Sequence, residues 1–311
     1  MHRIGLIGLG KIATSRHGPT ILAHPAFTLA GVADTRGEFP NDDVPAFRSH
    51  AEMLAGLRDL DAVAICTPPG ARFRIALDAL EAGRHVLLEK PPTATVAEIL
   101  LLQDAAKRAG RVLFAAWHSQ HNEAVDAARE RLAGETVETV TVTWKEDVHK
   151  WHPGQDWIWR SGGFGVFDPG VNALSILTRI LPQPPFVRDA DLFVPAGADT
   201  PIAAQITFGF GSGEGEGHAE FDWRPEAGEL REIGVTTRAG TVLRLMASGG
   251  RLLVNGETVM DGPRAEYPRL YGHFDALLRA GTSDIDIAPL VLAADALQLG
   301  RRFPVPMPRP R

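Results

Sequence analysis

The sequence predicts two domains of different classes: an α/β domain with a doubly wound parallel sheet, and an α+β domain with an open, mainly antiparallel sheet. The chain has 311 residues, which is enough for about two domains. Its first part alternates short apolar runs with helix-like stretches, the pattern of βαβ units. After about residue 120, one strictly alternating segment is followed by strand-like runs that Gly-rich or Pro-rich turns separate, as in antiparallel sheets. We therefore expect one domain over residues 1–119 and a second over residues 120–311.

Composition and charge exclude several classes of partner. Hydrophobic residues make up 44% and charged residues 23% of the chain, as in ordinary soluble globular proteins. The net charge is −6 and the isoelectric point is near 6.0, so we expect no basic surface for nucleic acid or for an anionic membrane. Cys66 is the single cysteine, which excludes an internal disulfide and fits a buried thiol in a reducing compartment. No signal-type segment and no run of about 18 apolar residues is present, and we expect a cytoplasmic protein.

Five continuous apolar runs in the first part predict parallel strands that are buried on both faces. These runs are residues 3–8, 27–34, 61–66, 85–89 and 111–117. Helices are expected between them, over residues 11–23, 71–82 and 95–109. Thr95 can cap the third helix at its start, and Gly110 ends it.

The second part predicts long strands and three helices. The first strand covers residues 137–149. Further strands are expected at residues 186–194, 202–210, 216–223, 230–238, 241–247 and 251–254, with helices at 166–181, 266–280 and 288–302. We expect that helix 288–302 can pack back on the first domain. An open sheet leaves one face to be covered, so we assign substrate binding and homo-oligomer formation to this second domain.

A glycine-rich motif directly follows the first predicted strand and opens a helix. It consists of Gly8, Leu9, Gly10, Lys11, Ile12 and Ala13, in the pattern G-x-G-x-x-A. Such glycines let the backbone approach a pyrophosphate, which the helix N-terminus stabilises. Asp34 follows 21 positions after Ala13, where a carboxylate can bind the ribose 2′-hydroxyl of NAD, whereas Arg36 offers a clamp for the 2′-phosphate of NADP. The motif predicts a Rossmann domain that binds NAD or NADP, with NAD favoured by Asp34.

A charged pair ends the fourth predicted strand, in the segment LLEKPP. Ligands bind outside the carboxyl ends of strands in open α/β sheets, so Glu89 and Lys90 are expected beside the glycine loop. A desolvated lysine can donate or accept a proton, which makes Lys90 a candidate catalytic residue, although a lysine at a strand end can also be a simple surface residue. We further expect cofactor contacts from residues at the ends of two other strands: Thr67, Pro68, Trp117 and His118.

Four motifs, in this order, resemble one enzyme family along nearly the whole chain. They are GLGKIA, CTPP, EKPP and GGFGVFDPGVN. Together they resemble the glucose-fructose oxidoreductase and inositol dehydrogenase family. The segments WKEDVHKWHPGQDWIW and GGFGVFDPGVNALSILTRILP resemble its branch of bacterial L-arabinose 1-dehydrogenases and D-galactose 1-dehydrogenases. The resemblance implies a catalytic set of the EKP lysine with an Asp and a His four positions apart. Lys90 and Asp168 match it, and position 172 departs from it. In the aldose 1-dehydrogenase branch, the resemblance implies that Asn172 is a substrate ligand.

Asn172 raises the question of which group takes the proton, because a carboxamide can bind a hydroxyl but cannot accept its proton. Lys90 is our first choice of base, with Asp168 adjusting its charge state and orientation. His152 is the second choice, and Asp168 itself is the third. Asp168 has an alternative structural role as a helix N-cap, since Pro169 suits the first helical position.

The segment around Glu146 predicts a site for a polar ring. In a strand over residues 137–149, Glu146 shares the apolar face and needs partners there, whereas Asp147 lies on the solvated face. Four of the six tryptophans crowd into this region: Trp144, Trp151, Trp157 and Trp159. Aromatic surfaces beside polar groups suit sugars, although some of these tryptophans can belong to the core. The resemblance places Glu146 and His152 among the sugar-binding residues.

These features predict an NAD(P)-dependent aldose 1-dehydrogenase that oxidises C1 of L-arabinose or D-galactose, in the pyranose form, to the aldonolactone. We expect Lys90 and the four second-domain residues to bind the sugar, and the cofactor to take the hydride. Two alternatives remain: a family oxidoreductase for an inositol or an anhydrosugar, and a non-catalytic dinucleotide-sensing protein. We expect no metal site, because His149 and His152 have no third convergent ligand.

Overall fold

The computed structural model describes residues 1–36, 43–211, 215–263 and 265–307, and the chain divides into two compact units. Unit 1 contains Met1–His118 and Glu266–Ile287, and unit 2 contains Ser119–Ala265 and Ala288–Arg311. The chain passes from unit 1 to unit 2 after His118, next to the domain boundary expected after residue 119. It returns to unit 1 over Glu266–Ile287. The second domain is therefore not one continuous stretch from residue 120 to residue 311.

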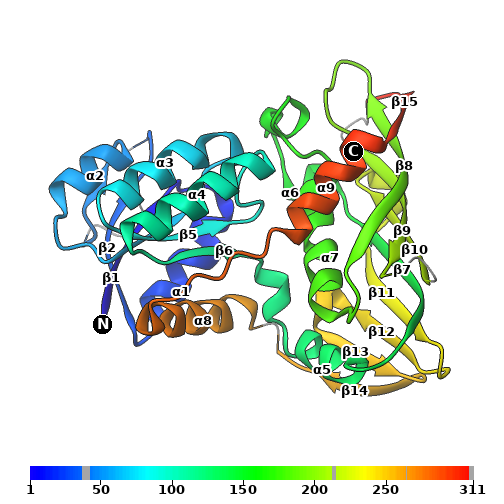
Figure 1. The fold of residues 1–311 in the computed structure, drawn as a ribbon. Helices are drawn as coiled ribbons and strands as arrows, with labels where there is room; N and C mark the ends of the chain where they lie inside the picture. The colour runs from blue at the N-terminus through cyan, green and yellow to red at the C-terminus, as the bar shows by residue number, and fades with distance from the viewer. Residues whose placement is uncertain (37–42, 212–214, 264, 308–311) are drawn as a thin grey trace. The chain divides into compact units, whose positions relative to one another are not determined.

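Unit 1 is built on a six-stranded sheet in the order β3-β2-β1-β4-β5-β6, in which every neighbouring pair is parallel (Figure 1). The strands are β1 (His2–Ile7), β2 (Phe27–Ala33), β3 (Ala46–Phe47), β4 (Ala62–Ile65), β5 (His85–Glu89) and β6 (Leu113–Ala116). All residues of β4 and β6 are buried, as the continuous apolar runs predicted. The expected doubly wound sheet is confirmed, with the short strand β3 in addition.

Helices cover both faces of this sheet. They are α1 (Gly18–Ala23), α2 (His50–Gly56), α3 (Pro69–Glu81), α4 (Val96–Ala109) and α8 (Glu266–Ala280). Helices α2, α3 and α4 lie on one face, and α1 and α8 lie on the other (Figure 1). Thr95 caps α4 in a capping box with Glu98, and Gly110 ends it at φ 61°, as expected. Helix α2 was not predicted.

Helix α8 belongs to unit 1 because its apolar stripe completes the core of that unit. Tyr271 and Phe274 are fully buried, and Phe274 stacks on Phe27 and Phe114 with ring centroids 5.9 Å apart. Helix α9 (Ala288–Leu299) instead packs on α7 (Phe167–Ile180) and β8 within unit 2. Helix α9 is thus part of unit 2, and the late helix that belongs to unit 1 is α8.

Unit 2 is built on a nine-stranded sheet in the order β14-β13-β12-β11-β7-β10-β9-β8-β15. The strands are β7 (Val137–Lys145), β8 (Pro185–Pro195), β9 (Ala203–Phe210), β10 (Gly215–Asp222), β11 (Leu230–Thr237), β12 (Val242–Met246), β13 (Arg251–Val254), β14 (Glu257–Asp261) and β15 (Arg301–Val305). Among the described strands of this sheet, only the pairs β7/β10 and β8/β15 are parallel. The mainly antiparallel character expected of this sheet is confirmed.

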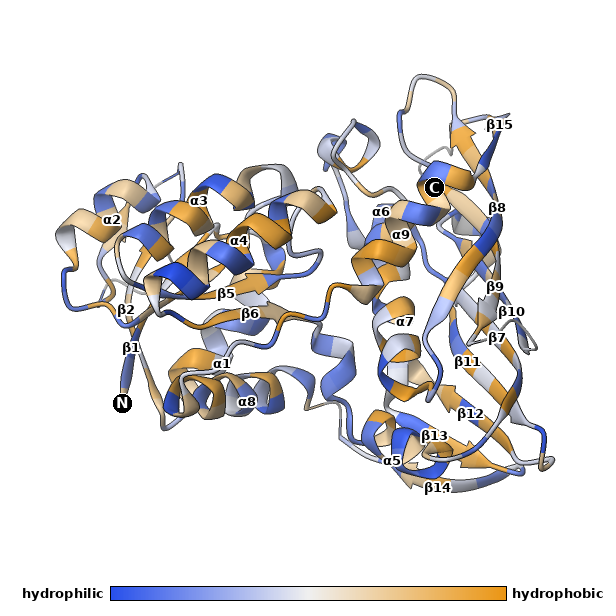
Figure 2. Cartoon of the chain, viewed as in Figure 1, coloured by the Kyte–Doolittle hydropathy of each residue, from blue (hydrophilic) through white to orange (hydrophobic). Residues whose placement is uncertain are grey.

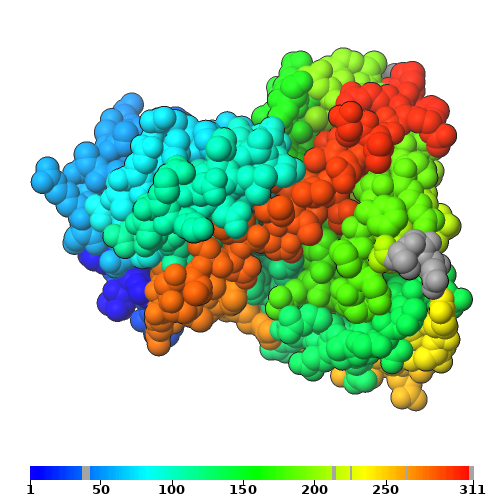
Figure 3. Space-filling model, in the orientation of Figure 1, coloured from blue at the N-terminus to red at the C-terminus, as the bar shows by residue number. Residues whose placement is uncertain are grey.

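Helix α7 packs against both α5 (Glu123–Leu132) and α9, and all three helices pack against this sheet. Helix α7 is almost entirely buried, and its orange colour in Figure 2 reflects its apolar sequence. Figure 3 shows α9 and β15, in red, seated against the yellow-green strand β8. Helix α5 was not predicted.

Two predicted element ends need correction. The strand expected over residues 137–149 ends at Lys145, because the chain turns into the short helix α6 (Val148–Trp151). Asp147 caps this helix by accepting a hydrogen bond from the His149 backbone N–H at 2.9 Å, so it is not merely solvated. The helix expected to reach residue 302 ends at Leu299, because Arg301 begins the parallel pairing of β15 with β8.

Exposed apolar side chains on unit 2 include Phe186, Leu230 and Val242, which lie on strands β8, β11 and β12. A homo-oligomer through this sheet stays a prediction. Among the described residues, no helix is both long and apolar enough to cross a bilayer.

Candidate active site

The carboxyl ends of the parallel strands in unit 1 bring distant loops to one edge of the sheet. Strands β1, β2, β4, β5 and β6 end at Ile7, Ala33, Ile65, Glu89 and Ala116. The expected cofactor residues lie at or shortly after these ends: Gly8, Gly10, Lys11, Ile12, Asp34, Arg36, Thr67, Pro68, Glu89, Lys90, Trp117 and His118. The structure therefore assembles this whole set at the edge where open α/β sheets bind ligands.

The glycine loop has the shape that a dinucleotide needs. Gly8 has φ 85°, and a Cβ there would lie 2.8 Å from the Thr67 backbone nitrogen. A Cβ on Gly10 would meet no described atom within 4 Å, so open space lies above this position. Thr67 Oγ1 is buried without a hydrogen-bond partner in the described part of the chain. These three features fit the pyrophosphate of a dinucleotide: the tight turn at Gly8, the open space at Gly10 and the unpaired hydroxyl of Thr67.

Asp34 and Arg36 form one interlocked group at the end of β2. Asp34 accepts hydrogen bonds from the Leu9 backbone N–H at 2.8 Å and from Arg36 Nε at 2.8 Å. Arg36 Nη2 also donates to the Leu9 carbonyl oxygen at 2.6 Å. Burial alone would raise the pKa of Asp34, but the hydrogen bonds from Arg36 and Leu9 lower it to about 2. The carboxylate is thus a fixed anion, as binding of a ribose hydroxyl requires.

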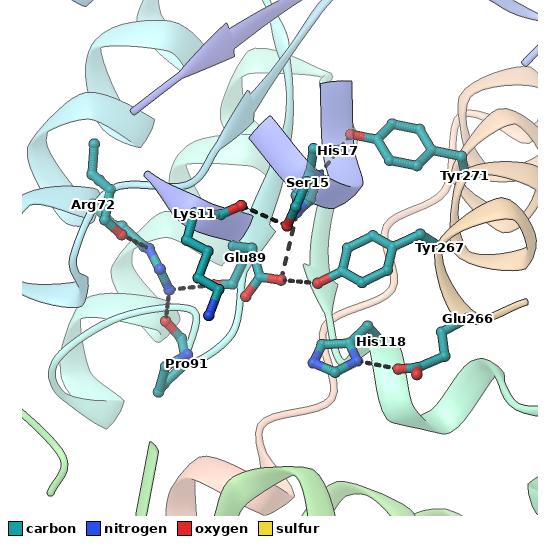
Figure 4. A network of polar contacts seen from close by, with 11 residues as sticks. Lys11, Ser15, His17, Arg72, Glu89, Pro91, His118, Glu266, Tyr267 and Tyr271 are labelled. Atoms are coloured by element: carbon teal, nitrogen blue, oxygen red, sulfur yellow. Dashed lines mark hydrogen bonds and ion pairs between the residues drawn. The ribbon is translucent and has the colours of Figure 1, made fainter. Parts of the chain in front are cut away.

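Glu89 is the centre of a buried polar network in unit 1 (Figure 4). Its Oε1 accepts a hydrogen bond from the Tyr267 hydroxyl at 2.7 Å and lies 3.5 Å from His17 Nε2. His17 Nδ1 lies 2.8 Å from the Tyr271 hydroxyl, and His118 stacks on Tyr267 with ring centroids 5.3 Å apart. The network joins α8 and the helical stretch Ala13–His17 to the strand end that carries Lys90.

The network keeps Glu89 ionised although its side chain is only 2% exposed. Burial alone would raise its pKa, but the His17 hydrogen bond and the nearby charges of His118, His17 and Lys90 lower the pKa to about 2. Burial, together with the charge of Glu89, raises the pKa of Tyr267 well above its ordinary value, so the phenol remains a hydrogen-bond donor. The residue directly before Lys90 in the sequence is therefore a buried carboxylate that remains ionised.

In unit 2, His152 and Asp168 form a pair. His152 Nε2 lies 3.2 Å from Asp168 Oδ2, and both side chains are largely buried. The other ring nitrogen, Nδ1, lies 3.2 Å from Gln155 Oε1, which also accepts a hydrogen bond from Trp157 Nε1 at 3.1 Å. Helix α7 begins one residue before Asp168 and its N-cap is Val166, so the alternative role of Asp168 as the cap is wrong.

Glu146 follows β7 and has the partners that its burial requires. Its Oε1 accepts a hydrogen bond from Trp144 Nε1 at 2.9 Å and lies 2.8 Å from Arg231 Nε in an ion pair. Arg231 also lies over the Trp151 ring, 5.2 Å from its centroid. Both contacts involve the same oxygen, and Oε2 receives no hydrogen bond within the described ranges of the chain. Glu146 is thus held in place with one acceptor left for a ligand.

Asn172 lies one helical turn after Asp168 on α7 and is half-buried. Its carboxamide makes no hydrogen bond to another residue that the structure describes, and the nearby Ser175 Oγ donates instead to the Asn172 main-chain oxygen at 2.8 Å. A polar amide held on a rigid helix without a protein partner is suited to a ligand hydroxyl.

Several residues that hold this machinery in place were not predicted. In unit 1 they are His17, Arg72, Tyr267 and Tyr271, and in unit 2 they are Gln155, Trp223 and Arg231. Of these residues, only Trp223 and Gln155 could have been suspected from the sequence. Trp223 is an aromatic residue, and Gln155 is an amide, each near an apolar segment. Among the described residues, no three potential metal ligands converge.

Comparison with known proteins identifies the family. Residues 2–117 match the GFO/IDH/MocA model, an oxidoreductase family with an NAD-binding Rossmann fold. Galactose 1-dehydrogenase from Pseudomonas fluorescens is 44% identical over 307 residues, which are 97% of each chain. The chain belongs to the GFO/IDH/MocA family. This assignment confirms the family resemblance of the four motifs and shows that the protein is an NAD-binding oxidoreductase.

Solved structures agree with the fold of this GFO/IDH/MocA oxidoreductase. The crystal structure of a D-galactose-1-dehydrogenase from Rhizobium etli has a TM-score of 0.92 and 44% identity, covering 98% of this chain and 96% of that one. The 3-ketoreductase KijD10 from Actinomadura kijaniata, solved with NADP, has a TM-score of 0.84 at 15% identity, covering 98% and 99% of the two chains. The second likeness supports the fold alone.

Glu89→Gln should destabilise the oxidoreductase in a way that depends on pH. The pKa of Glu89 is lowered in the folded state, so its stabilising contribution is fully present above the ordinary value of 4.5 and is lost as the pH falls towards about 2. Since one pKa unit corresponds to about 1.4 kcal/mol, the difference in unfolding free energy between wild type and variant should shrink by about 3 kcal/mol across this window. Urea unfolding between about pH 6 and about pH 3 measures it, and about 2 kcal/mol of the change should be seen by pH 3.

The matched control is Glu81→Gln, at an exposed carboxyl on α3, which should follow the wild type at every pH. A difference between Glu89→Gln and wild type that stays constant over the whole range would contradict an ionised Glu89.

Proposed function

We propose that this oxidoreductase is an NAD(P)-dependent aldose 1-dehydrogenase that oxidises C1 of D-galactose, L-arabinose or both, in the pyranose form, to the aldonolactone. The observation that carries the proposal is the 44% identity to galactose 1-dehydrogenase along 97% of both chains. The retained polar set of Lys90, Glu146, His152, Asp168 and Asn172 supports it, because a sugar offers several hydroxyls to be bound. A purely dinucleotide-sensing protein has no use for such a set.

The bound dinucleotide supplies an acceptor for the hydride that leaves C1. Lys90 takes the proton of the C1 hydroxyl, and the buried carboxylate of Glu89 stabilises the ammonium that results. Glu146, His152, Asp168 and Asn172 bind and orient the ring hydroxyls, which reduces the entropy lost on reaching the reactive geometry. Asn172 contributes hydrogen bonds only.

The surroundings of His152 favour Lys90 over His152 as the base. Trp157 Nε1 is a donor only, so the Gln155 atom that faces it is the oxygen, and the same oxygen faces His152 Nδ1. His152 Nε2 faces Asp168. Both ring nitrogens of His152 are therefore already directed at side chains of this protein, whereas a base must direct one of them at the substrate hydroxyl.

The direct test is a panel of initial rates with D-galactose, L-arabinose, D-glucose, D-xylose and myo-inositol, each with NAD and with NADP. We expect turnover concentrated in the galactose and arabinose pair, because their pyranose rings share stereochemistry from C2 to C4. Absorbance of the reduced nicotinamide gives the rates. Preferential turnover of myo-inositol would favour the polyol alternative, and tight dinucleotide binding without any turnover would favour the sensor.

Lys90→Met should lower kcat by about 10²- to 10⁴-fold, the usual contribution of a positioned base, while the Kd for the reduced dinucleotide changes little. Nucleotide fluorescence measures binding and steady-state kinetics measure kcat. Lys107→Met, which removes an exposed lysine of α4 in the same unit, is the control and should behave as wild type. Unchanged turnover in Lys90→Met would assign the proton to another group.

Asp34→Ala should shift the cofactor preference towards NADP. We propose that Asp34 favours NAD, because its carboxylate repels a 2′-phosphate and holds Arg36 through the 2.8 Å hydrogen bond to Nε. Without the carboxylate, Arg36 is released to meet the phosphate. The ratio of kcat/KM for NADP to that for NAD should therefore rise in Asp34→Ala and fall back in the double variant Asp34→Ala with Arg36→Ala. An unchanged ratio would remove Asp34 from cofactor selection.

A further inference from the structure

Arg72 is a buried cation bound to the segment that carries Lys90. It lies on α3 and is 4% exposed. Its Nε donates a hydrogen bond to the Thr67 carbonyl oxygen at 2.7 Å, and its Nη1 donates to the carbonyl oxygens of Glu89 and Pro91. Glu89 and Pro91 are the two neighbours of Lys90 in sequence. Figure 4 shows the guanidinium directed at this segment from the side opposite Tyr267.

A guanidinium is buried only at a large desolvation cost unless its donors are satisfied. Here the donors bind carbonyl oxygens from two separate loops, those after β4 and β5. The planar fork of arginine presents several donors in a fixed arrangement, whereas an ammonium is a compact point charge on a flexible stem. A lysine at position 72 would keep the charge but could not reproduce this set of hydrogen bonds.

The loop after β4 also contacts the glycine motif. The Thr67 backbone is so close to Gly8 that a Cβ on that glycine would lie 2.8 Å from the Thr67 nitrogen. Arg72 therefore ties the backbone on both sides of Lys90 to the loop that packs on the dinucleotide motif. The carboxylate of Glu89 is meanwhile held from α8 by Tyr267 at 2.7 Å.

We propose that Arg72 is a positioning residue for Lys90: its guanidinium fixes the backbone from Glu89 to Pro91 and so sets the direction of the Lys90 side chain relative to the dinucleotide loop. This proposal rests on the proposed role of Lys90. Arg72 itself touches neither substrate nor cofactor in this role. Its effect on the reaction is exerted through the orientation of the lysine.

The test compares Arg72→Lys and Arg72→Met with Arg74→Met. Arg74 lies on the same helix with an exposed side chain that pairs with Asp78, so its removal controls for loss of a positive charge on α3. In Arg72→Lys we expect kcat to fall by about 100-fold, the loss that follows a misplacement of about 1 Å, with little change in the Kd for the reduced dinucleotide. Arg74→Met should retain wild-type kcat.

A second measurement needs neither sugar nor dinucleotide. Amine acylation of the protein alone, followed by peptide mass mapping, gives the labelling rate of Lys90 relative to the exposed Lys107 in the same sample. Lys90 is half-buried, so release of its backbone should raise its relative rate several-fold in Arg72→Lys and leave it unchanged in Arg74→Met. This readout remains valid even if no sugar of the panel is a substrate, so failure of the proposed function and failure of the positioning role are distinguishable.

Two results would overturn the positioning role. One is an Arg72→Lys protein with wild-type kcat and wild-type Lys90 labelling. The other is a loss of kcat that only parallels a loss of folded protein and of dinucleotide binding, which would show a general structural role. If Arg72→Met does not fold, Arg72→Lys alone decides between these outcomes, because it retains the buried charge.

Discussion

The hydrogen bond between the Tyr267 hydroxyl and Glu89 Oε1 joins segments 178 residues apart and fixes the polar centre of unit 1. A carboxylate with 2% exposure persists as an anion only if donors surround it. Tyr267 can supply its donor only because the chain returns to unit 1 at α8, after strands β7 to β14 of the second sheet. The late helix and the early strand therefore depend on each other: the apolar face of α8 completes the core, and its first turn satisfies the charge beside Lys90.

Unit 2 also holds buried polar side chains in place, but with separate partners and not through one shared network. Its polar side chains are each held by a partner of their own, Glu146 by Trp144 and Arg231, and His152 by Gln155 and Asp168. Holding groups in place before a ligand arrives reduces the ordering that binding requires. Asn172 differs, because its carboxamide is positioned by the helix α7 and not by a hydrogen-bond partner. A residue that only orients a hydroxyl needs no partner for proton transfer. Under the proposed function, Asn172 in place of the family's His keeps a hydroxyl-binding group at this position of α7, and the proton is taken by another residue.

The sequence predicted most of the elements and the edge of the sheet where the candidate cofactor residues gather, because both follow from local patterns. Continuous apolar runs gave the parallel strands, and Thr95 and Gly110 gave the ends of α4. What it could not predict depends on contacts between distant segments. The return of α8 to unit 1 is decided by packing of Phe274 on Phe27 and Phe114, and nothing in the local pattern of α8 distinguishes this from packing in unit 2. Helix α5 was missed because its mean hydropathy is low, and the helical turn after Lys145 because the alternation of polar and apolar residues continues through it.

The same distinction explains which candidate site residues the sequence could suggest. Lys90, Asp168, Glu146 and His152 stand in short motifs, whereas the groups that orient them come from elsewhere in the fold. Arg231 reaches Glu146 because β11 pairs with β7 in a register that places it opposite Trp144. Arg72 reaches the loop after β5 because α3 packs across that strand. A buried arginine between two strand-end loops has no signature in sequence beyond its charge. Its hydrogen bonds to the main-chain oxygens of Glu89 and Pro91 hold the backbone on both sides of Lys90. The position of Lys90 therefore depends on this tertiary contact and not on the EKPP motif alone.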